Sequence, residues 1–307
     1  MRTTLGHLIF GSKVNIMEKK QHQPACSIDE LIDNLESKGL EIPNEESAKA
    51  FLDEVSYFRV IKAYSLGLKE KNGNYNPGTS FDEIVELYSF NTYFRQLLFP
   101  QIERIEITLR SRIANYFSAT YGVLGYYDCA NFATAKYHQE FLHDQEREVG
   151  YNSRSPFIKN FRDNYVGGNI PFYALVEVLT FGTLSKFYRN LLPEAKKAIA
   201  SSYGVKYTYL QSWIESISHV RNICAHYGRL YNAKLSKAPT LYNSYSKLGI
   251  SNYTIFAVLL CIKHLIPNDY RWETFIDTLN DLFEKYPHVK KETMGFPDNW
   301  KELLITE

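Results

Sequence analysis

Hydrophobic positions recur every three to four residues along most of the chain, which is the spacing that gives an α-helix one apolar face. The clearest stretch covers residues 101–119, where the apolar positions are Ile102, Ile105, Leu109, Ile113 and Phe117. Strand-like alternation and internal repeats are absent from the sequence. The pattern therefore predicts an all-α fold in which helices pack as a bundle.

Capping and helix-breaking residues divide this pattern into elements. Ser27 and Glu30 have the spacing of a capping box, and Gly39 is suited to ending the short helix that follows. Pro100 either opens a new helix or kinks a continuous one. Further helices are predicted over residues 45–68, 82–98, 101–119, 171–188, 193–201, 208–227, 252–265 and 272–286. Loops are expected at 71–78, 150–155, 166–169 and 233–250, with few helices in the middle of the chain.

These elements suggest four regions. We expect a flexible N-terminal extension at 1–27, an N-terminal helical segment at 28–78 and a helical core at 79–235. The last region, 236–307, is expected to be a loop and C-terminal helices that pack on the core. Its most apolar stretch, 254–262, is too short to span a bilayer, so no membrane association is expected.

Composition limits the classes of function. The chain has 35 Lys and Arg against 34 Asp and Glu, a net charge of +1, so any contact with RNA must come from local patches. The four cysteines are far apart and form no CxxC pair, which argues against a zinc knuckle and a disulfide framework. Cysteine usage and the lack of a signal peptide at the N-terminus predict a cytoplasmic protein.

The helix predicted at 208–227 carries the candidate chemistry. At about 100° per residue its apolar residues share one face: Leu210, Trp213, Ile214, Ile217, Val220 and Cys224. The opposite face holds Glu215, His219, Asn222 and His226. Gly228 is predicted to be the C-cap, which places His226 in the last helical turn. His226 should therefore point away from the core.

Arg221 lies at the edge of the apolar face. A half-buried arginine needs an anion, and Glu103 or Glu106 could supply it. An interhelical ion pair alone would explain the residue. The guanidinium has five donors, however, and can hold a carboxylate on one side and a phosphate on the other.

Arg221, Asn222 and His226 together suit RNA transesterification. The 2′-hydroxyl must lose a proton and the 5′-oxygen must gain one, and histidine can do both near neutral pH. Arginine can bind the scissile phosphate and asparagine can orient it, without a metal or other cofactor. The spacing alone is not specific, because Arg2 and His7 have it too. A solvated surface histidine is the alternative interpretation of His226.

The residues around this motif resemble a known family. The run from Arg221 to Asn232, together with segments 57–64, 81–90 and 102–110, is similar to the Abi-like family, the AbiD/AbiF group of bacterial phage abortive-infection proteins. That family carries a HEPN domain with an arginine–asparagine–three residues–histidine motif. The resemblance covers roughly residues 28–235 and leaves the C-terminal helices without a recognised motif.

The resemblance implies a HEPN-type core at 79–235 and a metal-independent endoribonuclease that acts in abortive infection. Catalysis would fall to Arg221, Asn222 and His226, and one motif per chain implies a homodimer with the two motifs facing each other. Some family members sit beside a small noncoding RNA, which makes a regulatory RNA an expected partner besides the RNA substrate. Supporting or RNA-binding roles are expected for Glu103, Glu106, Arg110, Tyr227, Arg229 and Tyr231.

One position departs from a related group. HEPN toxins with an adjacent nucleotidyltransferase place a tyrosine two residues after the histidine. Here that position is Gly228, and Tyr227 directly follows His226. Tyrosine modification as in that toxin pair is therefore not supported.

Other interpretations remain open. The chain could be a non-catalytic RNA-binding or scaffolding protein that keeps the HEPN fold. Glu215 and His219, at i and i+4, could belong to a metal-dependent hydrolase, although a solvated face explains them better. His138 and His143 are interpreted as solvated helix surface. A basic surface interleaved with tyrosines could form from Lys186, Arg189, Lys196, Lys197, Lys234, Lys237, Tyr188, Tyr231 and Tyr242.

Overall fold

The computed structural model describes residues 24–267 and 269–305. The predicted all-α class is confirmed, since these residues form α-helices, short 3-10 turns and isolated β-bridges, with no strand. The α-helices are α1 (Ile28–Glu36), α2 (Glu45–Glu54), α3 (Tyr57–Tyr64), α4 (Phe81–Tyr121), α5 (Ala135–Tyr151), α6 (Pro156–Asn164), α7 (Phe172–Leu175), α8 (Phe181–Asn190), α9 (Pro193–Ser201), α10 (Tyr207–Ala225), α11 (Asn243–Lys247), α12 (Ile255–Lys263), α13 (Tyr270–Lys285) and α14 (Trp300–Ile305).

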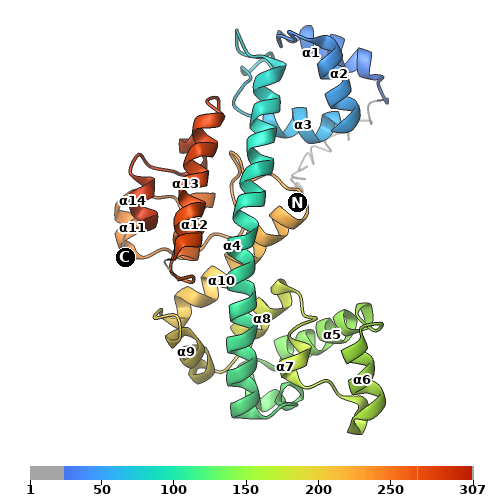
Figure 1. Ribbon diagram of the computed structural model, residues 1–307, viewed down its shortest axis with the longest axis vertical. Coiled ribbons are helices and arrows are strands. Elements are labelled where there is room, and N and C mark those ends of the chain that lie inside the picture. The colour runs from blue at the N-terminus through green and yellow to red at the C-terminus, as the bar shows by residue number, and fades with distance from the viewer. Residues whose placement is uncertain (1–23, 268, 306–307) are drawn as a thin grey trace, which may run out of the picture.

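Helix α4 spans the length of the molecule (Figure 1). Ser80 caps its start by accepting a hydrogen bond from the Glu83 N–H at 3.2 Å. Of the two alternatives for Pro100, the continuous helix is correct, because the proline lies inside the 41-residue element. Buried residues follow at intervals of three or four from Phe81 to Phe117, so one face stays in the core throughout.

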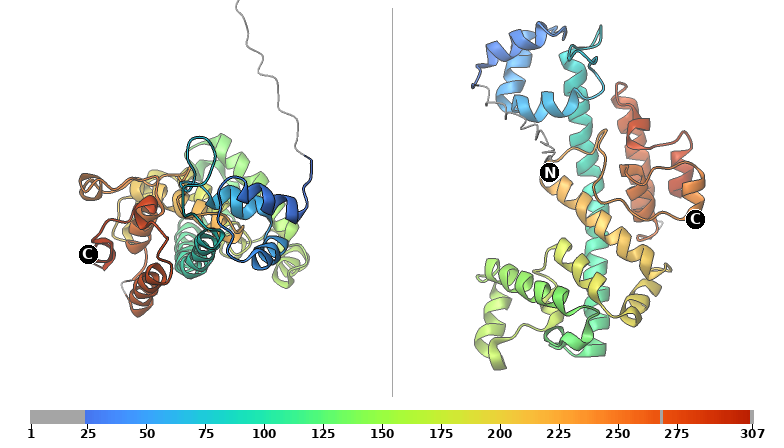
Figure 2. Two further views of the ribbon diagram at one scale, coloured as in Figure 1. Left: turned by 90° about the horizontal axis from the view of Figure 1, so that it is seen from above. Right: turned by 180° about the vertical axis from the view of Figure 1, so that it is seen from behind.

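The other helices gather around α4 in groups. Helices α1 to α3 lie at its N-terminal end, and α5 to α7 lie near its C-terminal end (Figure 1). Helix α10 packs across the middle of α4 and also contacts α8, α9 and α12. The view from behind shows this crossing, and in that view α12 to α14 lie to the right of α4 (Figure 2). The crossing brings the two ends of α10 against different neighbours.

Several predicted boundaries match closely. The capping box of Ser27 and Glu30 forms, Pro193–Ser201 is α9, and the loop predicted at 71–78 contains no helix. The single helix predicted at 45–68 is wrong. Helix α2 ends at Glu54, and Ser56 caps the start of a separate helix, α3. The helix predicted at 171–188 is likewise two, with Thr180 capping α8.

The middle of the chain is helical, contrary to the prediction. Helix α5 is hard to detect in the sequence because polar side chains occupy core positions, namely His138, Asp144 and Glu148. His138 is therefore not solvated. Its Nε2 lies 2.9 Å from the Tyr126 carbonyl oxygen and its ring stacks on Phe132. His143 is exposed, as predicted.

The segment 233–250 is only partly an exposed loop. It contains α11, and Leu235 and Leu241 are buried. The Trp213 indole donates to the Thr240 carbonyl at 2.7 Å, which fastens the segment to α10. The predicted flexible extension falls almost wholly on residues 1–23, outside the described range. None of the described helices combines the length and apolarity needed to cross a membrane.

Candidate active site at the end of α10

The predicted apolar face of α10 is confirmed and its opposite face in part, since Glu215 and His219 are half-buried. All six predicted core residues are buried, from Leu210 to Cys224, whereas Asn222 and His226 are exposed. The helix ends at Ala225, so His226 is the C-cap, one position beyond the predicted last turn. Asn222 and His226 are i and i+4, and both open to solvent at the same helix end.

The chain after His226 closes the helix with a Schellman motif. Tyr227 N–H donates to the Cys224 carbonyl at 3.3 Å, and Gly228 N–H donates to the Ile223 carbonyl at 2.7 Å. The left-handed residue is Tyr227, with φ of 57°, rather than the predicted Gly228. Gly228 is needed for another reason. A Cβ there would lie 2.8 Å from Ile223 Cγ2 and 3.1 Å from its carbonyl oxygen.

Two arginines from other helices hold the strained Tyr227. Arg59 of α3 donates to the Tyr227 carbonyl oxygen at 3.0 Å. The Arg95 guanidinium of α4 lies 5.8 Å from the centre of the tyrosine ring, within range of a cation–π contact. A left-handed tyrosine costs about 1–2 kcal/mol, which these contacts help to offset. The sequence pattern does not reveal either arginine.

A buried asparagine orders the segment beyond the helix. Asn91 of α4 is fully buried, and its Oδ1 accepts from Leu230 N–H at 2.7 Å and Tyr231 N–H at 3.0 Å. Its Nδ2 donates to the Gly228 carbonyl at 3.3 Å. In the sequence, Asn91 is a polar residue on the apolar face of a predicted helix. A buried polar side chain needs hydrogen-bond partners, so this position indicates a role for Asn91.

Arg221 finds its anion in Glu106. Its Nε lies 3.3 Å from Glu106 Oε2, while the other carboxylate oxygen pairs with Arg110, which also donates to the Val176 carbonyl. Glu106 is buried, whereas Glu103 is exposed. The Nε contact is not aligned as a hydrogen bond, and the Arg221 side chain keeps 34% exposure. The guanidinium thus has donors free for a second anion.

Arg229 and Tyr231 serve the fold in this conformation. Arg229 donates to the carbonyl oxygens of Tyr231 and Asn232 at 2.8 and 2.9 Å, and burial lowers its pKa. Tyr231 is buried with its ring edge-on to Phe90. Of Tyr227 and Tyr231, Tyr227 is the accessible one, with 69% of its surface exposed. Its ring is available to contact a base.

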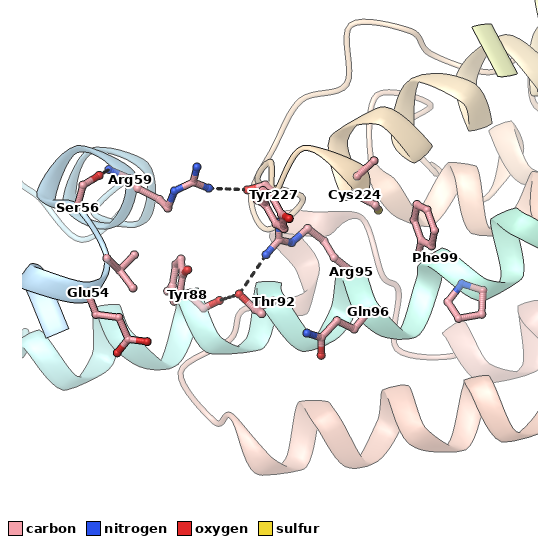
Figure 3. A pocket seen from close by; sticks show the side chains of 13 residues that line it. Glu54, Ser56, Arg59, Tyr88, Thr92, Arg95, Gln96, Phe99, Cys224 and Tyr227 are labelled. Atoms are coloured by element: carbon pink, nitrogen blue, oxygen red, sulfur yellow. Dashed lines mark hydrogen bonds between the residues drawn. The ribbon is translucent and has the colours of Figure 1, made fainter. Parts of the chain in front are cut away.

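Two pockets meet at Tyr227 and Arg59. The larger, about 820 Å³, lies between the α2–α3 corner, α4 and the end of α10 (Figure 3). The smaller, about 380 Å³, is lined by His226 together with Phe58 and Arg229. The motif histidine thus faces a recess formed jointly with the N-terminal helices.

Comparison with protein families identifies this region. A family model described as Abi-like protein matches residues 50–232, more than half of the chain. The chain belongs to the Abi-like protein family. Comparison with curated proteins and with solved structures gave no match. Membership of this family suggests a role in phage abortive infection.

The Abi-like match contains the whole arrangement around the motif. It begins within α2, includes α3 and α4, and ends at Asn232, directly after the segment that Asn91 orders. Helices α11 to α14 lie beyond it. The residues that contact the motif therefore come from the part of the chain that defines the family.

Other predicted clusters of the Abi-like chain have local partners. Glu215 pairs with Lys237 at 2.9 Å, and His219 Nε2 lies 3.1 Å from Ser236 Oγ. Burial and Lys237 lower the pKa of His219. Within residues 24–267 and 269–305, no group of three His, Cys, Asp or Glu side chains is placed to hold a metal.

Part of the predicted basic surface comes together, because Lys186 and Arg189 line one small pocket and Lys196 contacts the Arg189 carbonyl. Lys186 pairs with Asp144, and Lys196 donates to the Arg189 carbonyl and approaches Gln211. Tyr188 is buried and donates to the Lys196 carbonyl. Arg189 lies over the ring of Tyr137 and Lys234 over that of Tyr253. Each of these basic groups is thus explained by a local contact.

Proposed function

We propose that the chain is a metal-independent endoribonuclease of the HEPN type that acts in phage abortive infection. The observation that supports this best is the end of α10, where Asn222 and His226 are exposed on one face and Glu106 positions Arg221 beside them. A purely structural histidine would have no reason to share its surface with an incompletely paired arginine. Family membership supports the defence role.

The proposed reaction is attack of an RNA 2′-hydroxyl on the adjacent phosphorus. A histidine removes the 2′-proton as the new P–O bond forms, and an acid protonates the departing 5′-oxygen as the old bond breaks. Arg221 binds a non-bridging phosphate oxygen with the donors that Glu106 does not occupy. Asn222 donates to the phosphate. The products are a 2′,3′-cyclic phosphate and a free 5′-hydroxyl.

We further propose that two chains form one active site. Base and acid are needed at opposite ends of the reacting phosphate, and each chain contributes one His226. A homodimer with its motifs face to face would supply both groups. The exposed ends of α10 leave room for such an approach. A noncoding RNA is a further proposed partner that would regulate access to this site, and it would be found by sequencing RNA that copurifies with the chain.

The test is RNA cleavage by the purified protein, with and without EDTA, beside His226→Ala and His219→Ala. His219 lies two turns earlier on the same helix and contacts Ser236 at 3.1 Å, away from the Arg221–His226 end, so it is the matched control. We expect EDTA-resistant cleavage that drops about a hundredfold or more in His226→Ala and persists in His219→Ala.

Other outcomes would change the assignment. Cleavage abolished by EDTA would indicate a metal-dependent enzyme instead. Tight RNA binding without cleavage by any of the three proteins would favour the non-catalytic RNA-binding alternative. Equal cleavage by wild type and His226→Ala would remove His226 from the mechanism.

A further inference from the structure

The larger pocket beside the motif contains an arginine that the fold does not neutralise. Arg95 projects from the core face of α4 and only 6% of its surface is exposed. Its Nε donates to the Asn91 carbonyl at 3.4 Å and one terminal nitrogen donates to Thr92 Oγ1 at 3.2 Å. The other terminal nitrogen is buried without a hydrogen-bond partner. No carboxylate pairs with Arg95 among the described residues.

An unpaired buried cation is costly, because the group has lost water without gaining an anion. Arg112 of α4 also has a terminal nitrogen without a hydrogen-bond partner, but its guanidinium covers the Tyr203 ring at 3.8 Å. Two further half-buried arginines of α4 have carboxylate partners. Arg104 pairs with Asp269 at 2.7 Å, and Arg110 pairs with Glu106. Arg95 is thus unlike either of them. Arg95 lines a pocket of about 820 Å³, and its unpaired charge makes that pocket favourable for an anion.

The pocket supplies further groups that favour an anion at the same end. Arg59 extends from α3 toward Tyr227, so two guanidinium groups approach from opposite sides (Figure 3). The single acidic residue in the lining, Glu54, is exposed, and its carboxylate points away from both (Figure 3). Two converging arginines are the arrangement that proteins use to bind phosphate.

The remaining walls suit a flat aromatic group. Tyr88 and Phe99 are half-buried and line the pocket one to two turns from Arg95 on either side. The Tyr88 ring is fixed by edge-on contacts with Phe51 and Tyr64 at 5.7 and 5.6 Å. At about 820 Å³ the pocket exceeds what a free phosphate would fill and is in the range of small-molecule sites. Aromatic walls stack on nucleobases with little sequence preference.

We propose that this pocket binds one nucleotide, with its phosphate on Arg95 and Arg59 and its base against Tyr88 or Phe99. The site is distinct from the Arg221–His226 motif but shares a wall with it, since Cys224, Ala225 and Tyr227 line the pocket. Phe99 also lies 5.8 Å from the Arg221 guanidinium. The assignment of this nucleotide to an RNA strand that continues to His226 rests on the proposed function; nucleotide binding itself does not.

The experiment is isothermal titration calorimetry of the full chain with the four ribonucleoside 5′-monophosphates, with uridine and with inorganic phosphate. A monophosphate has no internucleotide bond, so binding is read without cleavage. The test variant is Arg95→Met, which keeps the aliphatic bulk and removes the charge. The matched control is Arg104→Met, on the same helix but outside the pocket. Thermal unfolding of each protein is measured in parallel.

We expect monophosphates to bind more tightly than uridine or inorganic phosphate, and Arg95→Met to weaken them about ten- to a hundredfold. Arg104→Met should bind normally. Arg95→Met should lose little stability, because removal of an unpaired buried charge offsets the lost contact with the Tyr227 ring, whereas Arg104→Met should unfold clearly earlier. If Arg95→Met proves insoluble, the exposed Arg59→Gln gives the same information, with a weaker loss.

Three results would overturn the proposal: no monophosphate binding, unchanged binding in Arg95→Met, or inorganic phosphate binding as tightly as a nucleotide. RNA cleavage by the wild-type chain separates the two assignments. Monophosphate binding that depends on Arg95 in a protein that cleaves no RNA would leave the pocket standing and remove the nuclease. Cleavage without monophosphate binding would keep the nuclease assignment and remove the nucleotide pocket.

Discussion

The side-chain oxygen of Asn91 accepts the backbone N–H of Leu230 at 2.7 Å, across 139 positions of sequence. This bond and the two others of Asn91 fix the chain just after the candidate catalytic histidine. The fully buried Asn91 side chain thereby sets the path of residues 228–231, which form no helix of their own. The conformation of the motif is consequently a tertiary property rather than one of α10 alone.

Replacing Asn91 with leucine should destabilise the protein and disturb the site. Two buried N–H groups lose their acceptor, and each costs about 1–3 kcal/mol when left unpaired. We expect a loss of about 3 kcal/mol in the free energy of unfolding, measured by urea denaturation, and a parallel fall in RNA cleavage. Asn115→Leu, at an exposed position of the same helix, is the control and should change neither quantity.

Gly228 and Gly150 should respond oppositely to alanine. A Cβ at Gly228 would meet Ile223, so Gly228→Ala is expected to lower stability by about 1–3 kcal/mol. Gly150 lies within α5 with open space around its missing Cβ, so Gly150→Ala should raise stability by about 0.5–1 kcal/mol. Thermal unfolding of the two variants checks this. A stable Gly228→Ala protein would contradict the tight closure after His226.

Glu106 should be indispensable and Glu103 dispensable. Glu106→Gln removes the charge that Arg110 and Arg221 share. We expect a loss of about 3 kcal/mol, the low end for a broken buried pair because Arg221 is 34% exposed. Cleavage should fall as well, since Arg221 loses its orientation. Glu103→Gln should match wild type in both assays, and a defect of equal size there would refute this arrangement.

His264 should make the fold acid-sensitive. Burial lowers its pKa from 6.5 to about 4, and its ring stacks on Trp213 with Nε2 2.9 Å from the Tyr245 hydroxyl. Because the unfolded chain binds the proton more readily, stability is complete above pH 6.5 and is lost as the pH falls toward 4. Because the His264 ring is only half-buried, solvent screening reduces the loss from this group to about 1–2 kcal/mol.

The variant His264→Phe isolates that effect. Phenylalanine can keep the stacking on Trp213 but cannot titrate. Unfolding free energies of both proteins are measured by urea denaturation at several pH values between 4 and 7. We expect a smaller slope in the variant. Identical slopes would mean that the ring is not held neutral by the fold.

Sequence predicts structure best where local and tertiary demands agree. Helix α10 has an unbroken apolar face, and the hydrophobic pattern alone assigns its six apolar core residues correctly, although it misses the buried Ser216 and Ser218. The sequence does not predict helix α5, because three polar residues occupy its buried face, namely His138, Asp144 and Glu148. Each is satisfied by a partner outside the helix, such as the Thr180 and Thr183 groups bonded to Glu148.

At the candidate site, too, the sequence pattern misses residues whose partners lie far away in the chain. Arg221, Asn222 and His226 stand out because they are close together in sequence, and Glu106 is one of two partners that the pattern suggests. Asn91 and Arg95 do not stand out, because their importance arises from groups more than a hundred positions away. Both are polar residues on the buried face of α4. Polar positions on an otherwise apolar helix face are therefore the sequence feature most worth inspecting in related chains.

Because α4 continues through Pro100, it holds the residues along its length at a fixed spacing and rotation. Asn91 positions the segment after the motif and Glu106 positions the arginine at its start, so the interval between them is fixed by helical rise at about 22 Å. One inserted residue would rotate Glu106 by about 100° relative to Asn91 and withdraw it from Arg221. Length changes among homologues should therefore avoid residues 91–106 and collect where α4 meets the loops at either end.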